Sequence, residues 1–211
     1  ALGLARDRGH ADLGLQECRV RAEIDEARRI VDWLIKNGGN HLQWVGLEDI
    51  DDPSLRDAWA VRTGHIQDLA HARGITVGLG IQLYGSSNLQ LALDLIDIAG
   101  RDEETQVAAK VEEATEGLSW DVLNLSFGEF SGQEPQVFID SVNLAYRTMQ
   151  ARAPGVQVPA TIHVGNYPDL QVYYQGQSML YYFLVQYCDP GIEPWIHSVM
   201  YYNLFEEIGR A

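Results

Sequence analysis

Basic residues are scarce in this sequence. Its 211 residues include 15 Lys and Arg against 30 Asp and Glu, which gives a formal net charge of −15. No run of Lys or Arg is long enough to form a phosphate-binding stripe, so we expect no nucleic-acid partner. The acidity predicts a well-solvated surface that keeps the chain in solution.

Cysteine and long apolar runs are also rare. Cys18 and Cys188 stand far apart and form no CxxC pair, so we expect no zinc site. Their separation favours two thiols, with a single disulfide between them as the alternative. No stretch reaches the roughly 18 apolar residues of a membrane span, and the most apolar run, 179–188, is too short. Residues 1–10 lack the basic-then-apolar plan of a signal peptide, which leaves the compartment open, the periplasm and the exterior included.

The apolar content is sufficient for a sizeable core, because 46% of the residues are hydrophobic. Helical spacing of apolar residues alternates along the chain with short strand-like runs. Ser54 is the expected N-cap of the second helix, and Pro135 belongs to the first turn of a later one. The predicted helices are 21–39, 52–74, 88–98, 102–117, 134–155 and 175–188. The predicted strands are 40–48, 75–85, 120–130, 156–166 and 195–205.

Strands that alternate with helices predict an α/β fold with parallel strands joined by crossovers. An open, doubly wound sheet and a (β/α) barrel of the TIM type both accommodate five strands. Polar residues recur two apart on each predicted strand, for example Asn124 with Ser126 and Thr161 with His163. Strands of an open parallel sheet are covered on both faces and are apolar throughout, so this pattern favours the barrel.

A complete barrel has eight strands and about 250 residues. We therefore expect residues 1–211 to form a single, partial barrel domain, or a fragment of a longer barrel. If the chain is complete, closure requires a partner, such as a second copy in a homo-oligomer, or an unusual open form.

Catalytic groups of such barrels lie at the carboxyl ends of the strands. Carboxylates, amides, a histidine and tyrosines occur at these positions, and such groups suit a carbohydrate substrate because they bind sugar hydroxyls and rings. The candidate catalytic residues are Glu129, Glu48 and Glu206. The candidate substrate-binding residues are Gln82, Tyr84, His163, Asn166, Tyr201 and Asn203.

Glu129 is the predicted general acid. Cleavage of a glycosidic bond needs a carboxylic acid that protonates the leaving oxygen, and a second group that stabilises the oxocarbenium-like state. Phe127 and Phe130 would desolvate Glu129 and raise its pKa, as a general acid requires. Strict alternation places Glu129 on the face of Phe127, so a local bend at Gly128 is needed to redirect it. The alternative is a helix-capping or salt-bridged surface residue.

Three segments resemble the catalytic barrel of the β-N-acetylhexosaminidases and related glycosidases. "NHLQWVGLEDI" at 40–50 is similar to the family's N-h-x-x-W-x-h-x-D strand, where h is apolar. "LAHARGITVGLGI" at 69–81 matches the helix ending in A-x-x-R-G-I-x-V that enters the next strand. "LSFGEF" places Glu129 at the position of the acid in the family's Gly-Gly-Asp-Glu motif.

The resemblance covers residues 21–165 and implies a glycoside hydrolase barrel. Gly128 occupies the position of the Asp that would orient a substrate acetamido group. A different sugar, or a second carboxylate from the protein, therefore fits better than substrate-assisted cleavage of N-acetyl sugars. Barrel glycosidases that act on uronic acids fit the same residues equally well.

Two other functions stay open at this point. One is a non-catalytic sugar-binding or truncated barrel module. The other is a metal-dependent hydrolase that uses His163 and His197, although the six histidines form no HxH or HExxH motif. For the glycosidase we expect neither a metal nor another cofactor, since the carboxylates supply the chemistry.

Overall fold

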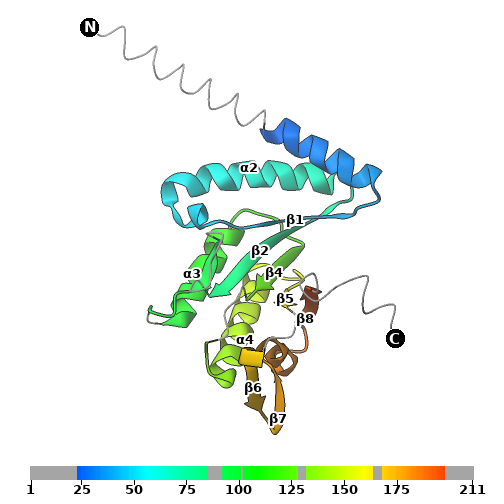
Figure 1. Cartoon of the computed structure of the whole chain (residues 1–211). Helices are drawn as coiled ribbons and strands as arrows, with labels where there is room; N and C mark the ends of the chain where they lie inside the picture. Colours follow the sequence, from blue (N-terminus) through cyan, green and yellow to red (C-terminus); the bar gives the residue numbers. More distant parts are fainter. Residues whose placement is uncertain (1–22, 85–91, 101, 128–131, 164–167, 198–211) are drawn as a thin grey trace, which may run out of the picture.

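The computed structural model describes residues 23–84, 92–100, 102–127, 132–163 and 168–197. Its centre is a six-stranded sheet in which every strand pair is parallel. Five strands follow one another in the order β1-β2-β4-β5-β8, and β3 pairs with the end of β2 (Figure 1). These strands are β1 (His41–Val45), β2 (Thr76–Tyr84), β3 (Asp94–Ile96), β4 (Val122–Ser126), β5 (Pro159–His163) and β8 (Glu193–His197).

Helical segments connect most of these strands. A helix over residues 23–36 precedes β1. The other α-helices are α2 (Pro53–His71), α3 (Glu103–Thr115) and α4 (Pro135–Arg152). Shorter 3-10 segments are η1 (Glu48–Asp51), η3 (Pro168–Leu170) and η4 (Tyr181–Tyr187). No helix in the described ranges is both long and apolar enough to cross a membrane.

The strand order distinguishes the two α/β architectures. A doubly wound sheet reverses its strand order at a switch point. Here the main strands are neighbours in the same order in which they occur along the chain. Right-handed crossovers that advance in one direction place the helices on one face of the sheet. The predicted α/β fold with parallel strands is confirmed, and its topology is that of a partial (β/α) barrel.

The sheet is strongly curled. His41 on β1 and Trp195 on β8 belong to the two outermost strands, yet their ring centroids lie 6.4 Å apart in an edge-to-face arrangement. Four spacings of about 4.8 Å would separate these strands by roughly 19 Å in a flat sheet. The approach of the two rings therefore requires the inner face of the sheet to be concave.

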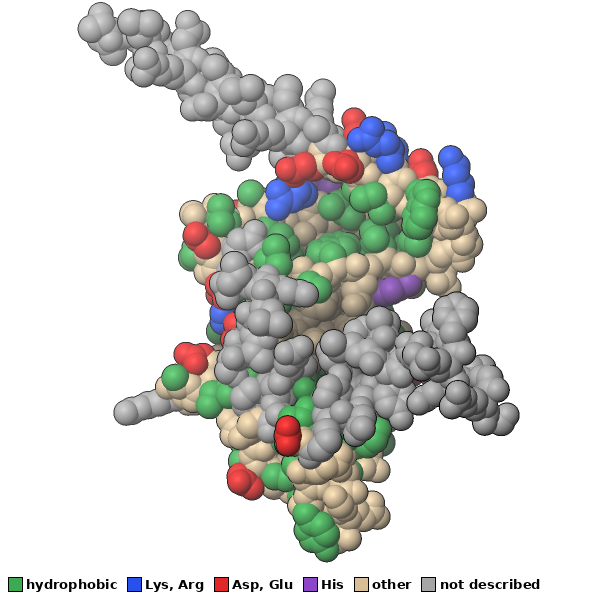
Figure 2. All heavy atoms as spheres, in the orientation of Figure 1, with side chains coloured by type: hydrophobic (Ala, Val, Ile, Leu, Met, Phe, Trp, Pro, Cys, Tyr) green, Lys and Arg blue, Asp and Glu red, His purple; other side chains and the backbone are tan. Residues whose placement is uncertain are grey.

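The hydrophobic core lies between the outer face of the sheet and the helices. Val77 and Leu79 of β2 are fully buried on this face. Phe127, which follows β4, packs edge to face on Phe138 of α4, with ring centroids 4.9 Å apart. In the space-filling view, Lys and Arg side chains gather mainly over the helix of residues 23–36 and α2 (Figure 2). Asp and Glu side chains are spread more widely over the same face (Figure 2).

Two predicted helices are wrong. In the described part of 88–98 the chain forms β3, because β2 extends beyond β1 and its free edge pairs with Asp94 and Ile96. The backbone N–H of Leu93 bonds to Gly46 and its carbonyl accepts from Gln82, which are sheet interactions.

The segment 175–188 is a hairpin followed by a 3-10 helix. Strands β6 (Gln171–Tyr174) and β7 (Gln177–Leu180) pair antiparallel, and η4 follows directly. Gln175 and Gly176 both have positive φ, 47° and 84°, as a two-residue hairpin turn of type I′ requires. The predicted N-cap of α2, Ser54, is also wrong. Asp52, two residues earlier, caps this helix and accepts from the N–H of Ser54.

Candidate functional site

The inner face of the curled sheet is polar and contains small residues. The strand register aligns Gly80 of β2 with Val45 of β1 and Asn124 of β4, and it aligns Ser126 with Thr161 of β5. Side chains on successive strands therefore meet on one concave surface. The polar strand faces predicted from the alternation form this surface.

A cavity of about 200 Å³ lies on the inner face, along the middle and the carboxyl-terminal halves of the strands. The described residues that line it come from four of the parallel strands and from Ala92, two residues before β3. None of these described residues carries a charged side chain. They are Gln43, Val45, Gly80, Ile81, Gln82, Ala92, Asn124, Ser126 and Thr161.

An amide pair crosses this cavity. Nδ2 of Asn124 donates to Oε1 of Gln43 at 3.4 Å, and Oδ1 of Asn124 accepts from the Thr161 hydroxyl at 2.8 Å. The pair spans β2, which lies between β1 and β4. This is feasible because Gly78 and Gly80 place no side chain on the inner face of β2. A Cβ on Gly78 would lie 3.0 Å from the ring of His41 and 3.1 Å from Oε1 of Gln43.

Gln82 lies within the cavity, as a substrate-binding residue would. Its side chain is 8% exposed, and its Nε2 donates to the carbonyl of Tyr84 at 2.6 Å. This bond fixes the amide so that its oxygen is the group available to a ligand. The sequence-based assignment of Gln82 as a binding residue stays a prediction.

Tyr84 lies elsewhere. Its side chain is fully buried beside Ser141 of α4, whose hydroxyl donates to Glu103 of α3 at 2.8 Å. Burial, partly offset by the Ser141 hydroxyl, raises the pKa of Tyr84 to about 12. Tyr84 is absent from the described lining of the cavity, so its position is that of a core residue at the junction of α3 and α4.

The candidate catalytic carboxylates are not placed by the structure. Glu48 lies in η1, directly after β1, and His163 ends β5, but neither side chain belongs to the described part of the chain. The other candidates lie outside the described residues: Glu129, Glu206, Asn166, Tyr201 and Asn203. Across the described ranges, no three His, Cys, Asp or Glu side chains come together as a metal site would require.

Sequence reasoning missed Gln43. The signal was its place in "HLQWV", where it alternates with His41 and Val45 on one face of β1. Asn124 and Thr161 were identified as polar strand residues but not as site residues. Their role depends on a contact between strands that are not neighbours, which a single sequence does not specify.

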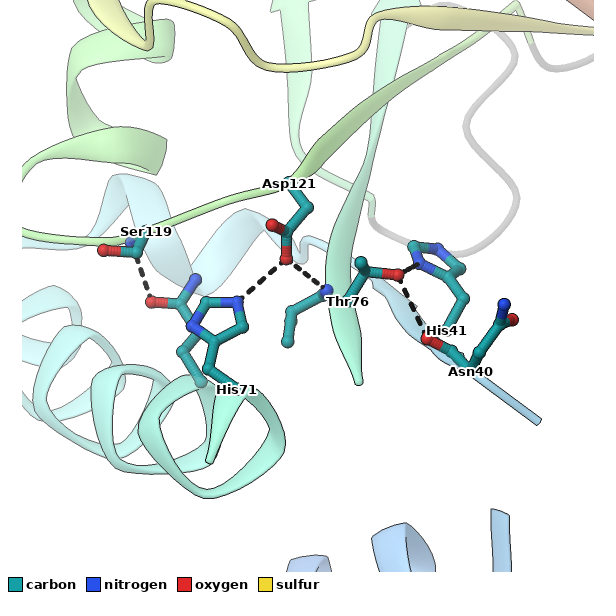
Figure 3. A network of polar contacts seen from close by, with 8 residues as sticks. Asn40, His41, His71, Thr76, Ser119 and Asp121 are labelled. Atoms are coloured by element: carbon teal, nitrogen blue, oxygen red, sulfur yellow. Dashed lines mark hydrogen bonds and ion pairs between the residues drawn. The ribbon is translucent and has the colours of Figure 1, made fainter. Parts of the chain in front are cut away.

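A second polar network lies at the opposite, amino ends of the strands (Figure 3). Oδ2 of Asp121 accepts from Nε2 of His71 at 2.8 Å and from the backbone N–H of Val77 at 2.7 Å. On the other side of β2, the Thr76 hydroxyl bonds to Nδ1 of His41 at 2.9 Å. These groups tie α2, β1, β2 and the start of β4 together, and this end of a barrel serves stability rather than catalysis.

Comparison with known proteins gives structural neighbours only. No protein-family model matches the chain, and no curated protein matches it in sequence. A mutant of the O-GlcNAc hydrolase from Thermobaculum terrenum superposes with a TM-score of 0.54 and 12% identity, over 81% of this chain and 37% of that protein. At this low sequence identity, the structural similarity shows the fold alone. That fold agrees with the parallel strand order of the sheet.

Two further structures are less similar. GH5_18 from Streptomyces cattleya, in complex with GlcNAc, gives a TM-score of 0.49 at 14% identity, over 66% of this chain and 39% of that one. DHDPS from Cyanidioschyzon merolae, with lysine bound, gives a TM-score of 0.41 at 10% identity, over 65% of this chain and 39% of that one. The chain thus spans well under half the length of each of the three proteins.

Proposed function

We propose that this chain is part of a carbohydrate-active (β/α) barrel that cleaves glycosidic bonds. The observation that carries the proposal is the cavity on the inner face, whose described lining includes amides and hydroxyls but no charge and reaches the carboxyl-terminal halves of the strands. Barrel enzymes bind their substrates at the carboxyl ends of the strands. Amides and hydroxyls from four strands converge in the cavity, and sugar hydroxyls need both donors and acceptors. The fold likeness to an O-GlcNAc hydrolase is consistent with this class of activity.

Glu129 is the general acid in this proposal. It follows Ser126, the last residue of β4, by three positions in the sequence, and Ser126 lines the cavity. Its carboxyl group would protonate the leaving glycosidic oxygen while charge develops on the sugar ring. Glu48, in the segment after β1, or Glu206 would supply the second carboxylate.

Bound substrate would be held by the polar groups of the inner face. Gln82 and Asn124 would hydrogen-bond sugar hydroxyls inside the cavity. His163, Asn166, Tyr201 and Asn203 follow or end the strands and would contact the rest of the sugar.

The test is hydrolysis of a panel of aryl glycosides by the full chain and by Glu129→Gln. We expect the substitution to lower kcat by about 100- to 10,000-fold for a nitrophenyl leaving group, which is the usual worth of a general acid. A dinitrophenyl leaving group departs without protonation, so its release should be much less affected. Glu134→Gln, at an exposed position before α4, is the matched control and should retain full activity.

Unchanged activity of Glu129→Gln on both leaving groups would reject this residue as the acid. Equal losses on both would indicate a role other than proton donation. Glu48→Gln and Glu206→Gln then identify the second carboxylate, because its removal slows cleavage regardless of the leaving group.

A sugar-binding module without turnover is the second candidate. Gly128 favours it, since the glycosidases that the sequence resembles have an Asp directly before the acid. Sugar binding with no hydrolysis of any glycoside in the panel, and no effect of Glu129→Gln on affinity, would favour this function over the hydrolase.

A further inference from the structure

The cavity on the inner face differs from an ordinary polar core in one respect. Gly80 lines the cavity, although neither its backbone conformation nor its packing requires glycine. Resting on the proposed function, we propose that the cavity takes a single neutral sugar residue, and that Gly80 determines specificity by leaving the space for the ring.

The packing around the two inner glycines separates their roles. At Gly78 a Cβ would lie 3.0 Å from the His41 ring and 3.1 Å from Oε1 of Gln43, so alanine there would displace a neighbouring side chain. At Gly80 the nearest atoms to a Cβ would be the Trp44 carbonyl oxygen at 3.5 Å and Val45 atoms at 3.6 Å, which are ordinary contacts. Gly80 also has no positive φ that would exclude alanine. A methyl group at position 80 therefore fits the fold and takes up space in the cavity.

The charge around the cavity selects against anionic sugars. None of the lining residues that the structure describes is charged. The whole chain carries a formal charge of −15. A uronic or sialic carboxylate would lose its hydration without gaining a cationic partner, which is costly.

The hydrogen-bonding groups in the cavity suit hydroxyls. Each side-chain amide has two N–H donors and an oxygen with two lone pairs. One Nδ2 hydrogen of Asn124 is used by Gln43, which leaves the second hydrogen and both Nε2 hydrogens of the exposed Gln43. Oε1 of Gln82 accepts nothing from the described residues. Donors and an acceptor without formal charge are complementary to a neutral polyol.

The size of the cavity limits the ligand to one ring. Sites for drug-sized ligands have volumes of about 300–1,000 Å³. The cavity is smaller, at about 200 Å³. A longer glycan would place its terminal residue in the cavity and the rest outside.

The test measures binding of methyl β-glucoside, methyl N-acetyl-β-glucosaminide and methyl β-glucuronide by calorimetry and by protein NMR shifts. We expect the two neutral glycosides to bind and the anionic glycoside to bind at least about tenfold more weakly. Gly80→Ala should weaken neutral binding by about 10- to 200-fold, the usual effect of one methyl-sized change in a fitted pocket. Gly64→Ala, in α2 with its nearest contact at 3.9 Å, is the matched control and should leave binding unchanged.

Each outcome has a defined meaning. The inference is overturned if the glucuronide binds as tightly as the neutral glycosides, or if Gly80→Ala binds the neutral glycosides as tightly as the wild type does. If Gly80→Ala fails to fold, Gln43→Leu removes the exposed donors without adding bulk to β2, and its neutral binding should fall about tenfold or more. Glycoside hydrolysis that survives Gly80→Ala unchanged would preserve the proposed function and reject this site. If the chain binds no sugar and hydrolyses none, both the inference and the proposed function are rejected.

Discussion

Gln43 and Asn124 hydrogen-bond to each other although β2 runs between their strands. Oε1 of Gln43 accepts from Nδ2 of Asn124 at 3.4 Å, above the glycines of β2. In (β/α) barrels the interior is filled by layers of side chains from alternate strands. β1 and β4 are alternate strands of the main sheet, so this contact reproduces barrel layering with polar groups.

Gly78→Ala should disrupt this layer. Its Cβ would lie 3.0 Å from the His41 ring and 3.1 Å from Oε1 of Gln43, so one of them must move. We expect a loss of about 1–3 kcal/mol in the free energy of unfolding, as for overpacking elsewhere. Urea denaturation followed by tryptophan fluorescence measures it.

Gly64→Ala is the control for Gly78→Ala. Gly64 lies inside α2 with open space around it, and alanine there should stabilise the chain by about 0.5–1 kcal/mol. A Gly78→Ala variant that unfolds at the wild-type urea concentration would show that His41 and Gln43 adjust without cost.

The sequence was sufficient to predict the elements that repeat regularly. The five main strands, α2 and α4 lie at or beside their predicted ranges, and the alternation of strands and helices implies parallel pairing. Most of the last predicted strand, 195–205, lies outside the described residues, and β8 covers Glu193–His197. Glycine and proline added boundaries, as at Pro135, the first residue of α4. Local signals and tertiary packing agree in these segments, and prediction succeeds where they agree.

Prediction failed where tertiary contacts determine the local conformation. Residues 94–96 form β3 because the end of β2 offers an unpaired edge, which helical propensity does not reveal. The hairpin of β6 and β7 depends on the left-handed backbone of Gln175, a residue that rarely adopts it.

Part of the candidate site was predictable. Alternation in the strands placed Gln82, Asn124 and Thr161 on one polar face, and the register confirms that face. Tyr84 follows the same alternation but is buried beside Ser141, because it ends β2 where α3 and α4 pack. The contact of Gln43 with Asn124 depends on the curl of the sheet, which no local pattern encodes.

Asp121→Ala should destabilise the fold through a buried backbone group. Oδ2 of Asp121 accepts from the N–H of Val77, a fully buried residue, at 2.7 Å (Figure 3). An unsatisfied buried N–H costs about 1–3 kcal/mol, and we expect a loss of that size in the unfolding free energy. Chemical denaturation at pH 7 measures it.

Two related variants separate the backbone bond from the ion pair. His71→Ala removes only a partly exposed pair with Asp121, worth about 0–1 kcal/mol. Asp121→Asn retains an oxygen that can accept from the N–H of Val77. Its loss in unfolding free energy should therefore lie between those of His71→Ala and Asp121→Ala. If His71→Ala cost as much as Asp121→Ala, the ion pair rather than the Val77 bond would be the main contribution.

Glu113→Gln should stabilise the protein at neutral pH. Burial, followed by the nearby Asp51 charge, raises the pKa of Glu113, although Lys110 and Arg56 oppose the shift. A raised pKa means that Glu113 favours folding below its unfolded pKa and that this contribution is lost as pH rises through the folded pKa. We expect a gain of under about 1 kcal/mol at pH 7, since partly exposed charges interact weakly.

The pH dependence tests the cause of that gain. The difference between Glu113→Gln and wild type should vanish by about pH 3, where both carry a neutral side chain. Glu116→Gln, at the exposed cap of the same helix, should show a smaller effect. A variant that is less stable than wild type at pH 7 would mean that the 3.7 Å pair with Arg56 outweighs the burial.

Cys188 should react slowly with alkylating reagents. Burial, followed by the charges of Asp140 and Asp189, raises the pKa of this thiol from 9.0 to about 12. The thiolate is the reactive form, so at pH 8 its population falls roughly 1,000-fold relative to an unperturbed thiol, and the rate falls with it.

Iodoacetamide labelling of Cys188 in a Cys18→Ser background, followed by mass spectrometry, gives the rate at each pH, and the urea-unfolded chain gives the unperturbed reference. A folded-state rate that keeps rising with pH beyond 10 identifies the raised pKa as the cause. A rate that levels off near pH 9 would instead mean that Cys188 is slowed by its place in an apolar cavity of about 330 Å³, beside Phe183 and Ile196, and not by its titration.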